Sequence, residues 1–457
     1  MSKREHPSFS SRIGFILVTA GAAVGLGNVW SFTYVAGKNG GGGFVLIYLL
    51  TLAFIATPVF LAEMLLGRLG KASTPTSLKK LQTSAGSKLP WALPAWVGLV
   101  ATILVLSFYA VISGQVMAYG WEALQGGFAG WEKDQIIALD KAFKADPSVP
   151  IFWSILFLIA TAAIVSLDIR KGLERASRLM MPVLFVMLIG LVLFAALRAD
   201  FSAAFNFLFG FNEMQLSPKI LMEAVGQAFF TLSVGVGGIM LYGSYMGDDV
   251  NLPKASLWIV LMDLSVALLA GLAIFPILFS ASIDPAAGPG LVFITLPLAF
   301  SGIPGGAILA FVFFLLLTFA AITSAISLLS PPTARLEEAG WSRAKSAWVM
   351  GACAFVLSLA TTLSFSSWVD FHPLAFLGFD GMTPFDLIRE GVNNVVLPLG
   401  GLAFALMVGW GLKREDVRAA LPMENGALFS IWYGALKYLV PVAIIALFLT
   451  AIFGGGH

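Results

Sequence analysis

The stretch Gly21-Ala-Ala-Val-Gly25-Leu-Gly27-Asn28 lies in the middle of an apolar run near residues 12–36. A second glycine cluster, Thr231-Leu-Ser-Val-Gly235-Val-Gly237-Gly238, interrupts another apolar run near residues 218–245. Glycine costs about 1 kcal/mol per helical position relative to alanine, so each cluster weakens a helix at its centre. The sequence therefore predicts two helices that unwind part-way along their length.

The composition places these helices in a lipid bilayer. Of the 457 residues, 58% are apolar and only 11% are charged, which is more apolar surface than a soluble protein can bury. The net charge of +2 gives no reason to expect a nucleic-acid partner. A single cysteine excludes an intrachain disulfide, and the three histidines are too scattered for a metal site.

A membrane-spanning helix needs roughly 20 predominantly apolar residues. Runs of about this length predict an all-α polytopic membrane protein with eleven transmembrane helices, near residues 12–36, 42–67, 91–124, 150–167, 177–197, 218–245, 255–281, 305–333, 345–366, 385–411 and 428–453. The outer segment at 284–306 is apolar, and we expect it to fold back into the protein as a lid.

Lysine and arginine indicate the orientation, because they are commoner in cytoplasmic segments. With a cytoplasmic N-terminus, nineteen of the 27 basic residues lie inside and seven outside, while Lys437 lies within the last span. We therefore expect a cytoplasmic N-terminus and an extracytoplasmic C-terminus.

The two glycine clusters fall in the first and sixth spans, which run in opposite directions. Paired breaks of this kind indicate a binding site near the bilayer midplane of an inverted-repeat transporter. The freed N–H groups suit an anion, and the freed carbonyls suit a hard cation such as Na⁺. The alternative is close helix packing through small residues, as Gly21 and Gly25 would allow.

Further long motifs follow one another in a fixed order along the chain: Lys3-Arg-Glu-His6, Asn39-Gly-Gly-Gly42, Glu63-Met-Leu-Leu-Gly-Arg68, Ala224-Val-Gly-Gln-Ala-Phe-Phe-Thr-Leu-Ser233, Gly288-Pro-Gly-Leu-Val-Phe-Ile-Thr-Leu-Pro297 and Leu397-Pro-Leu-Gly-Gly401. With the first glycine cluster, they resemble the neurotransmitter:sodium symporter family, and within it the LeuT-like and MhsT-like bacterial amino acid transporters. The resemblance implies a LeuT-type 5+5 inverted repeat with broken helices 1 and 6. Residues 1–200 would hold helices 1–5, residues 201–412 helices 6–10, and residues 413–457 the additional helix 11.

The same resemblance implies two sodium sites. The first would take its ligands from the substrate carboxylate and from Ala23, Asn28, Thr231 and Asp263. The second would use the carbonyls of Gly21, Val24 and Ala320 with the hydroxyls of Thr323 and Ser324. Hydroxyl bonding back to the helix is the alternative for those last two residues.

The implied substrate site combines backbone, hydroxyl and apolar groups, from Ala23, Gly25, Gly27, Val105, Tyr109, Phe230, Thr231, Ser233, Val236, Ser324 and Leu328. The Tyr109 hydroxyl would bind a carboxylate. Gly25 stands where monoamine carriers of the family have an aspartate, so the resemblance favours an α-amino acid over a monoamine. The apolar wall favours an apolar side chain, although its members are also typical of ordinary helix packing.

Charges and gates are interpreted in the same way. Asp263 would supply the negative charge that chloride gives in some members, so we expect no chloride requirement; proton exchange at Asp263 is the alternative.

The inner gate would involve Arg4, Glu338 and Tyr245. The outer gate departs from the family, because Ser31 replaces an arginine. Outer closure would then rely on Tyr109 over Phe230, with Gln227 nearby. Gly172 and Pro182 would form a hinge in helix 5.

We therefore expect a sodium-coupled symporter that imports small, hydrophobic α-amino acids across a bacterial inner membrane. An amino-acid-sensing receptor or an ion channel on the same fold is the alternative. An enzyme is disfavoured, because the sequence offers no nucleophile and base or metal cluster. The sequence leaves open the preferred amino acid, the sodium stoichiometry and whether the chain forms a homodimer.

Overall fold

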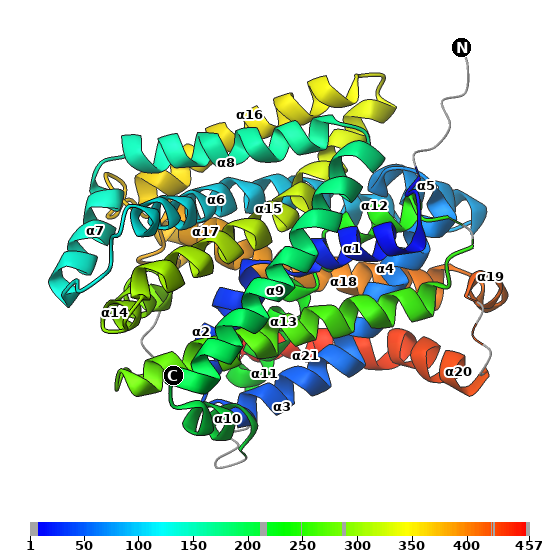
Figure 1. Cartoon of the computed structure of the whole chain (residues 1–457). Coiled ribbons are helices and arrows are strands. Elements are labelled where there is room, and N and C mark those ends of the chain that lie inside the picture. Colours follow the sequence, from blue (N-terminus) through cyan, green and yellow to red (C-terminus); the bar gives the residue numbers. More distant parts are fainter. Residues whose placement is uncertain are drawn as a thin grey trace.

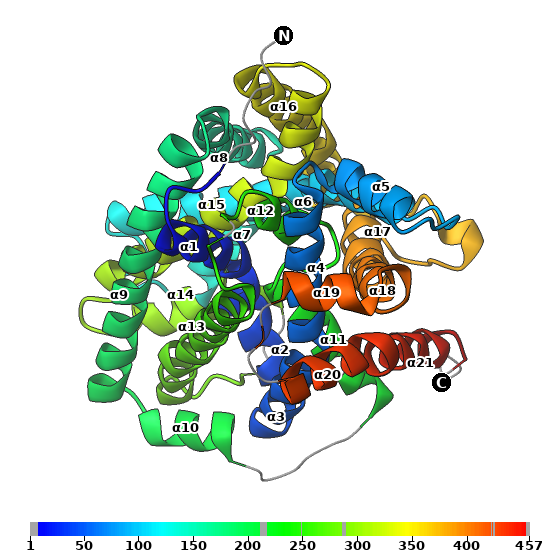
Figure 2. The ribbon, with the colours of Figure 1, turned by 90° about the vertical axis from the view of Figure 1, so that its right-hand side faces the viewer.

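The computed structural model describes residues 8–210, 217–247, 249–285, 289–421, 423 and 426–453. Every regular element within these residues is a helix, as the sequence predicted. Figure 1 shows the long helices packed side by side in one bundle, and Figure 2 shows the bundle turned by 90°.

Up to residue 209 the described residues form ten α-helices, and a π-helical turn directly precedes three of them, α2, α4 and α9. The π-helical turns are Gly27–Ser31, Leu52–Ala56 and Arg170–Glu174. The α-helices are α1 (Arg12–Ala23), α2 (Phe32–Lys38), α3 (Gly42–Thr51), α4 (Thr57–Gly70), α5 (Thr74–Ser84), α6 (Ala92–Leu124), α7 (Lys133–Ala145), α8 (Ser148–Ser166), α9 (Arg175–Arg198) and α10 (Phe201–Phe209).

The second half of the chain also consists of α-helices joined by short π-helical and 3₁₀ turns. Its α-helices are α11 (Pro218–Thr231), α12 (Gly238–Ser244), α13 (Leu252–Ser280), α14 (Thr295–Ser301), α15 (Gly306–Glu338), α16 (Arg343–Ser364), α17 (Pro384–Gly391), α18 (Leu397–Leu406), α19 (Arg414–Ala420), α20 (Gly426–Gly434) and α21 (Val440–Phe453). Short 3₁₀ turns occur at Pro289–Leu291 and Ala375–Leu377, and π-helical turns at Val392–Val396, Met407–Gly411 and Ala435–Leu439.

Nine of the described helices are long and apolar enough to cross a bilayer, and the bent pair α1 and α2 would make a tenth span. Large apolar side chains cover the outside of the bundle, among them Leu197 with 81% of its surface exposed and Val186 with 70%. Such a surface suits lipid and not water. The predicted sixth span is two short helices, α11 and α12, so the total of eleven spans stays a prediction.

The first span breaks where the glycine cluster predicted. α1 ends at Ala23, Val24 takes an extended backbone conformation, and the helix resumes at Gly27 with a bend of 49°. The start of α1 is fixed by the Ser11 side chain, which accepts a hydrogen bond from the Gly14 N–H.

The sixth span breaks over a longer stretch. Residues 232–237 separate α11 from α12 and belong to no helix. Gly235 and Gly237 have φ angles of +99° and +86°, which glycine adopts at little cost. Ser233 has a φ of +53°, which is rare for a residue with a side chain and typical of functional segments.

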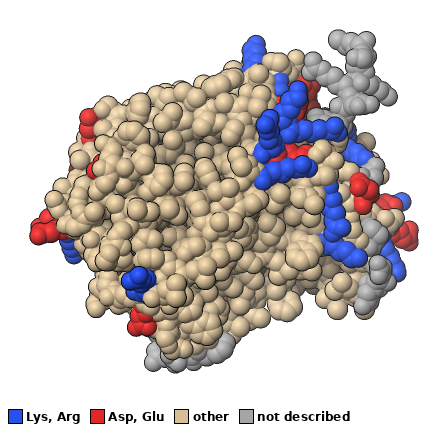
Figure 3. Space-filling view, viewed as in Figure 1, with Lys and Arg blue, Asp and Glu red and all other residues tan. Residues whose placement is uncertain are grey.

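Charge is unevenly distributed over the surface. On the face shown in Figure 3, most lysine and arginine side chains lie at the end of the bundle where α5 and α19 lie in Figure 1. A broad band next to them carries almost no charge. The described part of the predicted lid packs into the protein, because Leu291, Leu296 and Phe300 are buried.

Candidate functional site

The two broken segments lie against each other in the middle of the bundle. The Ser233 hydroxyl donates a hydrogen bond to the Ala22 carbonyl at 2.9 Å. The Gln227 side-chain amide donates to the Gly27 carbonyl, also at 2.9 Å. The Ala22 carbonyl, which lies at the break, is thus satisfied by a side chain of the other broken span, as burial requires. The Gly27 carbonyl also accepts the Phe32 N–H within its own π-helical turn, so the Gln227 contact is a second bond to it.

A cavity of about 40 Å³ lies between the two breaks. It is lined by Ala23, Gly25, Gly27, Val105, Tyr109, Phe230, Ser233, Val236, Ser324, Leu328 and Leu397. This set contains every residue predicted for the substrate except Thr231, and it adds Leu397 from α18. This volume exceeds what one water molecule needs.

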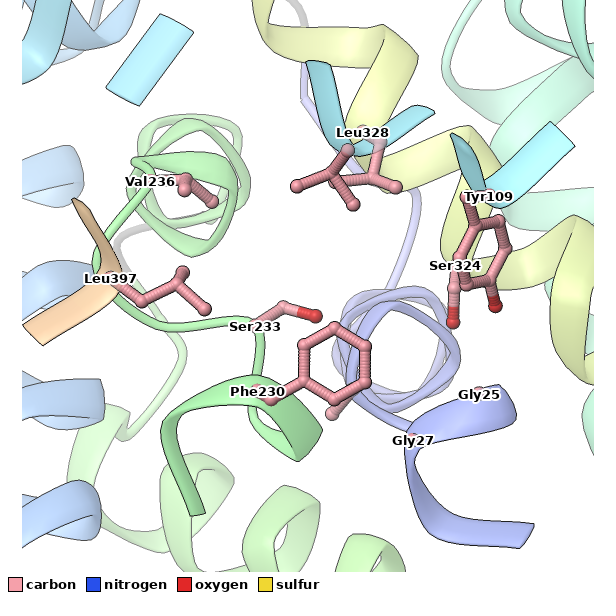
Figure 4. Close-up of a pocket in the computed structure, with 11 residues that line it drawn as sticks. Gly25, Gly27, Tyr109, Phe230, Ser233, Val236, Ser324, Leu328 and Leu397 are labelled. Atoms are coloured by element: carbon pink, nitrogen blue, oxygen red, sulfur yellow. The ribbon is translucent and has the colours of Figure 1, made fainter. Parts of the chain in front are cut away.

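One end of the cavity is polar. Figure 4 shows Tyr109, Ser324 and Gly25 together on one side. The Leu26 N–H donates to the Tyr109 hydroxyl at 3.4 Å, and an added carbon at Gly25 would collide with the Ser324 hydroxyl. The same carbon would lie 3.2 Å from the Tyr109 hydroxyl oxygen. This end offers hydroxyls and backbone groups to a ligand and leaves no room for a side chain at position 25.

The other end of the cavity is apolar. In Figure 4, Val236 and Leu397 lie opposite Tyr109, and Leu328 lies between the two ends. The exposed fractions of these three side chains are 4%, 3% and 8%. A guest with a charged group at one end and a hydrocarbon group at the other fits this division.

Three of the four residues predicted for the first sodium site, Asn28, Thr231 and Asp263, lie together beside the polar end, and the fourth, Ala23, lines the cavity. The Asn28 amide donates to Asp263 Oδ1 at 2.7 Å and to the Asp263 carbonyl at 3.1 Å. Thr231 lies next to the same carboxylate, and its hydroxyl forms a hydrogen bond of 3.2 Å with the Tyr48 hydroxyl.

Asp263 is fully buried, and its second oxygen, Oδ2, has no hydrogen-bond partner among the described residues. An ionised oxygen without a partner is costly in a dry interior. A hard cation prefers carboxylate, amide and hydroxyl oxygens as ligands. The donor set and the unpartnered oxygen therefore fit a sodium ion.

The residues predicted for the second sodium site also come together. The Ser324 hydroxyl donates to the Val24 carbonyl at 3.2 Å. The Thr323 hydroxyl bonds back to its own helix, at 3.1 Å from the Phe319 carbonyl and 3.0 Å from the Ala320 carbonyl, as the alternative predicted, and it also lies 3.5 Å from the Val24 carbonyl oxygen. An added carbon at Gly21 would lie 3.2 Å from Thr323 Cβ, so the first span passes close to α15 here. The freed carbonyl of Val24 faces two hydroxyls, which is a second oxygen cluster suited to a hard cation.

Glu63 in α4 holds the unwound part of the sixth span, a role that the sequence prediction missed. Its fully buried carboxylate accepts hydrogen bonds from the Gly235 N–H at 2.9 Å and from the Met240 N–H at 3.3 Å. These N–H groups lack helical partners because of the break, so Glu63 caps the start of α12. An acid in the middle of an apolar run was the signal that could have identified it.

The predicted outer gate is a hydrogen-bonded link in this structure. The Ser31 hydroxyl donates to Gln227 Oε1 at 2.7 Å, while the Gln227 amide reaches Gly27. Seven residues later in the same span, Lys38 forms an ion pair of 2.8 Å with Glu223. Both contacts join the second half of the first span to α11.

The predicted inner gate is described only in part, because Arg4 lies outside the described residues. Glu338 accepts hydrogen bonds from the Ser73 N–H at 2.5 Å and from the Thr76 hydroxyl at 2.6 Å, at the start of α5. Tyr245 is buried, and its carbonyl accepts from the Phe9 N–H at 3.1 Å.

The predicted hinge lies at a change of helix type. Gly172 is inside the π-helical turn Arg170–Glu174, and Pro182 is inside α9. Glu174 in the same turn accepts hydrogen bonds from the Ser10 N–H at 2.9 Å and from the Ser10 hydroxyl, and it forms an ion pair with Arg178. The start of the first span is therefore attached to the predicted hinge.

Comparison with known proteins places this geometry in a family. The model of the sodium:neurotransmitter symporter family matches residues 6–138 and 131–452. An uncharacterised sodium-dependent transporter of Bacillus subtilis (strain 168), YhdH, is 35% identical over 458 residues, which cover 99% of each chain. A sodium-dependent nutrient amino acid transporter of Drosophila mojavensis is 24% identical over 97% of this chain and 75% of its own length.

A solved structure shares the whole architecture. The crystal structure of MhsT in complex with L-phenylalanine matches with a TM-score of 0.90 and 37% sequence identity, over 97% of this chain and 99% of that chain. The fold, the paired breaks and the sequence matches agree, and this chain belongs to the sodium:neurotransmitter symporter family, whose members are sodium-dependent transporters.

Proposed function

We propose that this chain is a symporter that imports hydrophobic α-amino acids together with sodium. The observation that carries the proposal is the cavity between the two breaks. It has hydroxyls and backbone groups at one end and hydrocarbon at the other, and the unpartnered Asp263 oxygen lies in the cluster beside it.

The substrate would lie along the cavity with its carboxylate at Tyr109 and Gly25. The absence of a side chain at Gly25 supports this orientation. A side chain there, such as an aspartate, would occupy the space beside Ser324 and Tyr109 that we assign to the substrate carboxylate. Phenylalanine in the related MhsT crystal structure supports an apolar amino acid. Ser233 and the carbonyls of the broken spans would receive the amino group.

Two sodium ions would couple to the substrate. One would bind Ala23, Asn28, Thr231 and Asp263 together with the substrate carboxylate, and the other would bind Gly21, Val24, Ala320, Thr323 and Ser324. The substrate carboxylate completes the ligands of the first sodium ion. Bound sodium would therefore raise the affinity for the substrate, and bound substrate would raise the affinity for sodium by the same factor.

The membrane arrangement completes the proposal. Residues 1–200 and 201–412 would form two inverted repeats of five helices, followed by the helix of residues 413–457. The gathering of basic side chains at one end supports a cytoplasmic N-terminus in a bacterial inner membrane. Transport would alternate between outer closure at Ser31 and Gln227 and inner opening at Gly172 and Pro182.

Chloride would not be required, because Asp263 supplies the negative charge next to the first sodium. Uptake by the wild-type chain in gluconate buffer should equal uptake in chloride buffer. A loss of uptake in gluconate contradicts this part of the proposal alone.

The deciding experiment measures binding and uptake of a panel of amino acids by the purified chain, in detergent and in proteoliposomes. We expect saturable binding and uptake of apolar amino acids in sodium, with little of either in potassium. Binding without uptake would indicate a receptor, and conductance without saturable binding would indicate a channel. Binding that is equal in potassium and sodium overturns the proposed coupling.

A further inference from the structure

The apolar end of the cavity is closed by a helix that the substrate prediction did not include. Leu397 is the first residue of α18, and its side chain lines the cavity next to Val236. Figure 4 shows the two side chains on the same side of the cavity, reaching it from different parts of the chain.

Leu397 faces inward because of the turn that precedes it. The π-helical turn Val392–Val396 inserts an extra residue per turn and thereby rotates the face that follows. Val395 and Leu399 remain 44% and 45% exposed on the outside of the bundle, whereas Leu397 is 3% exposed. Turns of this type often occur at functional sites.

The backbone around Leu397 cannot move away from the cavity without disturbing the broken span. An added carbon at Gly235 would collide with the Leu397 carbonyl oxygen, and an added carbon at Gly400 would collide with the Gly235 carbonyl oxygen. Two glycines thus let α18 press directly on the unwound segment. The position of the Leu397 side chain is therefore fixed relative to that of Val236.

Val236 is held from the opposite direction as well. An added carbon at Gly98 in α6 would lie 2.7 Å from the Val236 carbonyl oxygen. The segment that carries Val236 is thus confined between α6 and α18. Because the valine side chain is short, the space beyond its methyl groups is bounded by the leucine of α18.

We propose that Leu397 is a specificity-determining residue, which closes the apolar end of the pocket and limits the length of the substrate side chain. The inference rests on the proposed function, since it assumes that an apolar α-amino acid lies in this cavity. A change of one methylene at such a wall alters binding about 10- to 200-fold.

The experiment compares the affinities of valine and tryptophan, each measured in sodium by displacement of a radiolabelled apolar amino acid. In L397A, the affinity for tryptophan relative to valine should rise about tenfold or more. In L397F, the same ratio should fall by about tenfold or more, because the ring occupies the end of the pocket.

Leu399 provides the matched control, since it is two residues away in the same helix and faces outward. L399A and L399F should leave the ratio unchanged. The ratio is measured within one protein sample and is thus independent of the amount of folded protein. If the larger changes prevent folding, L397V and L397M serve instead, because they change the volume less. L397V should raise the ratio of tryptophan to valine affinity a few-fold, and L397M should lower it a few-fold.

The outcomes separate the two proposals. Wild-type protein that binds no amino acid in sodium overturns the proposed function. Wild-type protein that binds amino acids, with equal selectivity in the Leu397 and Leu399 variants, overturns the role of Leu397 and leaves the function standing.

Discussion

The Asn28 side-chain amide donates to Asp263 Oδ1 at 2.7 Å, and thereby joins the broken first span to α13. The Asn28 oxygen accepts from the Gly25 N–H at 3.0 Å, so a single side chain connects the break to the buried acid. The other Asp263 oxygen has no hydrogen-bond partner among the described residues, and it is the oxygen that we propose binds sodium.

Replacement of Asp263 by asparagine should weaken sodium binding strongly. D263N keeps the size of the side chain and an oxygen for Asn28, but removes the negative charge beside the proposed cation. Removing one partner of a buried charge pair costs about 3–5 kcal/mol, so we expect the sodium concentration for half-maximal substrate binding to rise at least a hundredfold. The measurement is a sodium titration of amino acid binding.

D370N is the control for this change, because Asp370 is exposed and is not among the residues that line the cavity. It should leave the sodium titration unchanged. Sodium dependence of D263N equal to that of the wild type would show that Asp263 is not a ligand.

Replacement of Thr323 by valine tests the second sodium site. T323V keeps the shape of the side chain and removes the hydroxyl that lies near the Val24 and Ala320 carbonyls. We expect about a tenfold loss of apparent sodium affinity, since a hydroxyl ligand to a charge contributes about 1.5–3 kcal/mol at most.

Thr333 offers a matched control in the same helix. Its buried hydroxyl donates to the Leu329 carbonyl at 2.8 Å, so T333V removes an ordinary helical back-bond. Equal effects of T323V and T333V on the sodium titration would mean that Thr323 only supports the helix.

Replacement of Gly25 by alanine should abolish amino acid binding while the protein still folds. The added carbon would take the space between Ser324 and Tyr109 that we assign to the substrate carboxylate. G190A adds the same carbon in α9, where no atom beyond the adjacent backbone of its own helix lies within 4 Å, and should bind like the wild type. Full binding by G25A, measured by radioligand saturation, would exclude the proposed orientation of the substrate.

Replacement of Glu63 by glutamine should destabilise the broken sixth span. The glutamine has one acceptor oxygen in place of two, so either the Gly235 or the Met240 N–H loses its partner. An unsatisfied buried N–H costs about 1–3 kcal/mol, and we expect a lower midpoint of thermal unfolding together with weaker substrate binding.

The exposed Glu415 in the first turn of α19 serves as the control for that change. E415Q should unfold at the same temperature as the wild type. An unchanged midpoint in E63Q would show that the unwound segment does not depend on the Glu63 carboxylate.

The sequence predicted the two breaks because their cause is local. Clusters such as Gly25 and Gly27, or Gly235 and Gly237, weaken a helix wherever it lies. The family motifs then gave the residues around the cavity, and ten of them line it together. The predicted sixth span is the least regular, because its break extends over residues 232–237.

The residues that the sequence prediction missed act across the fold. Glu63 is 172 positions from its hydrogen-bond donor Gly235, and no periodic pattern links the two. Leu397 depends on a π-helical turn and on the contact between Gly235 and Gly400, neither of which has a signal in a single sequence. The sequence analysis placed Gln227 near the outer gate but did not pair it with Ser31, because a hydrogen bond between two uncharged side chains has no charge signal in the sequence.

The three glycines at 98, 235 and 400 also set a limit on how this protein could be redesigned. Each of them lets two main chains touch, so a methyl group at any of these positions would push whole helices apart. Substitutions at these positions therefore cannot adjust the distance between the helices around the pocket without disrupting their packing. A change of substrate selectivity must therefore come from substitutions of the apolar side chains that line the pocket, while the backbone behind them stays in place.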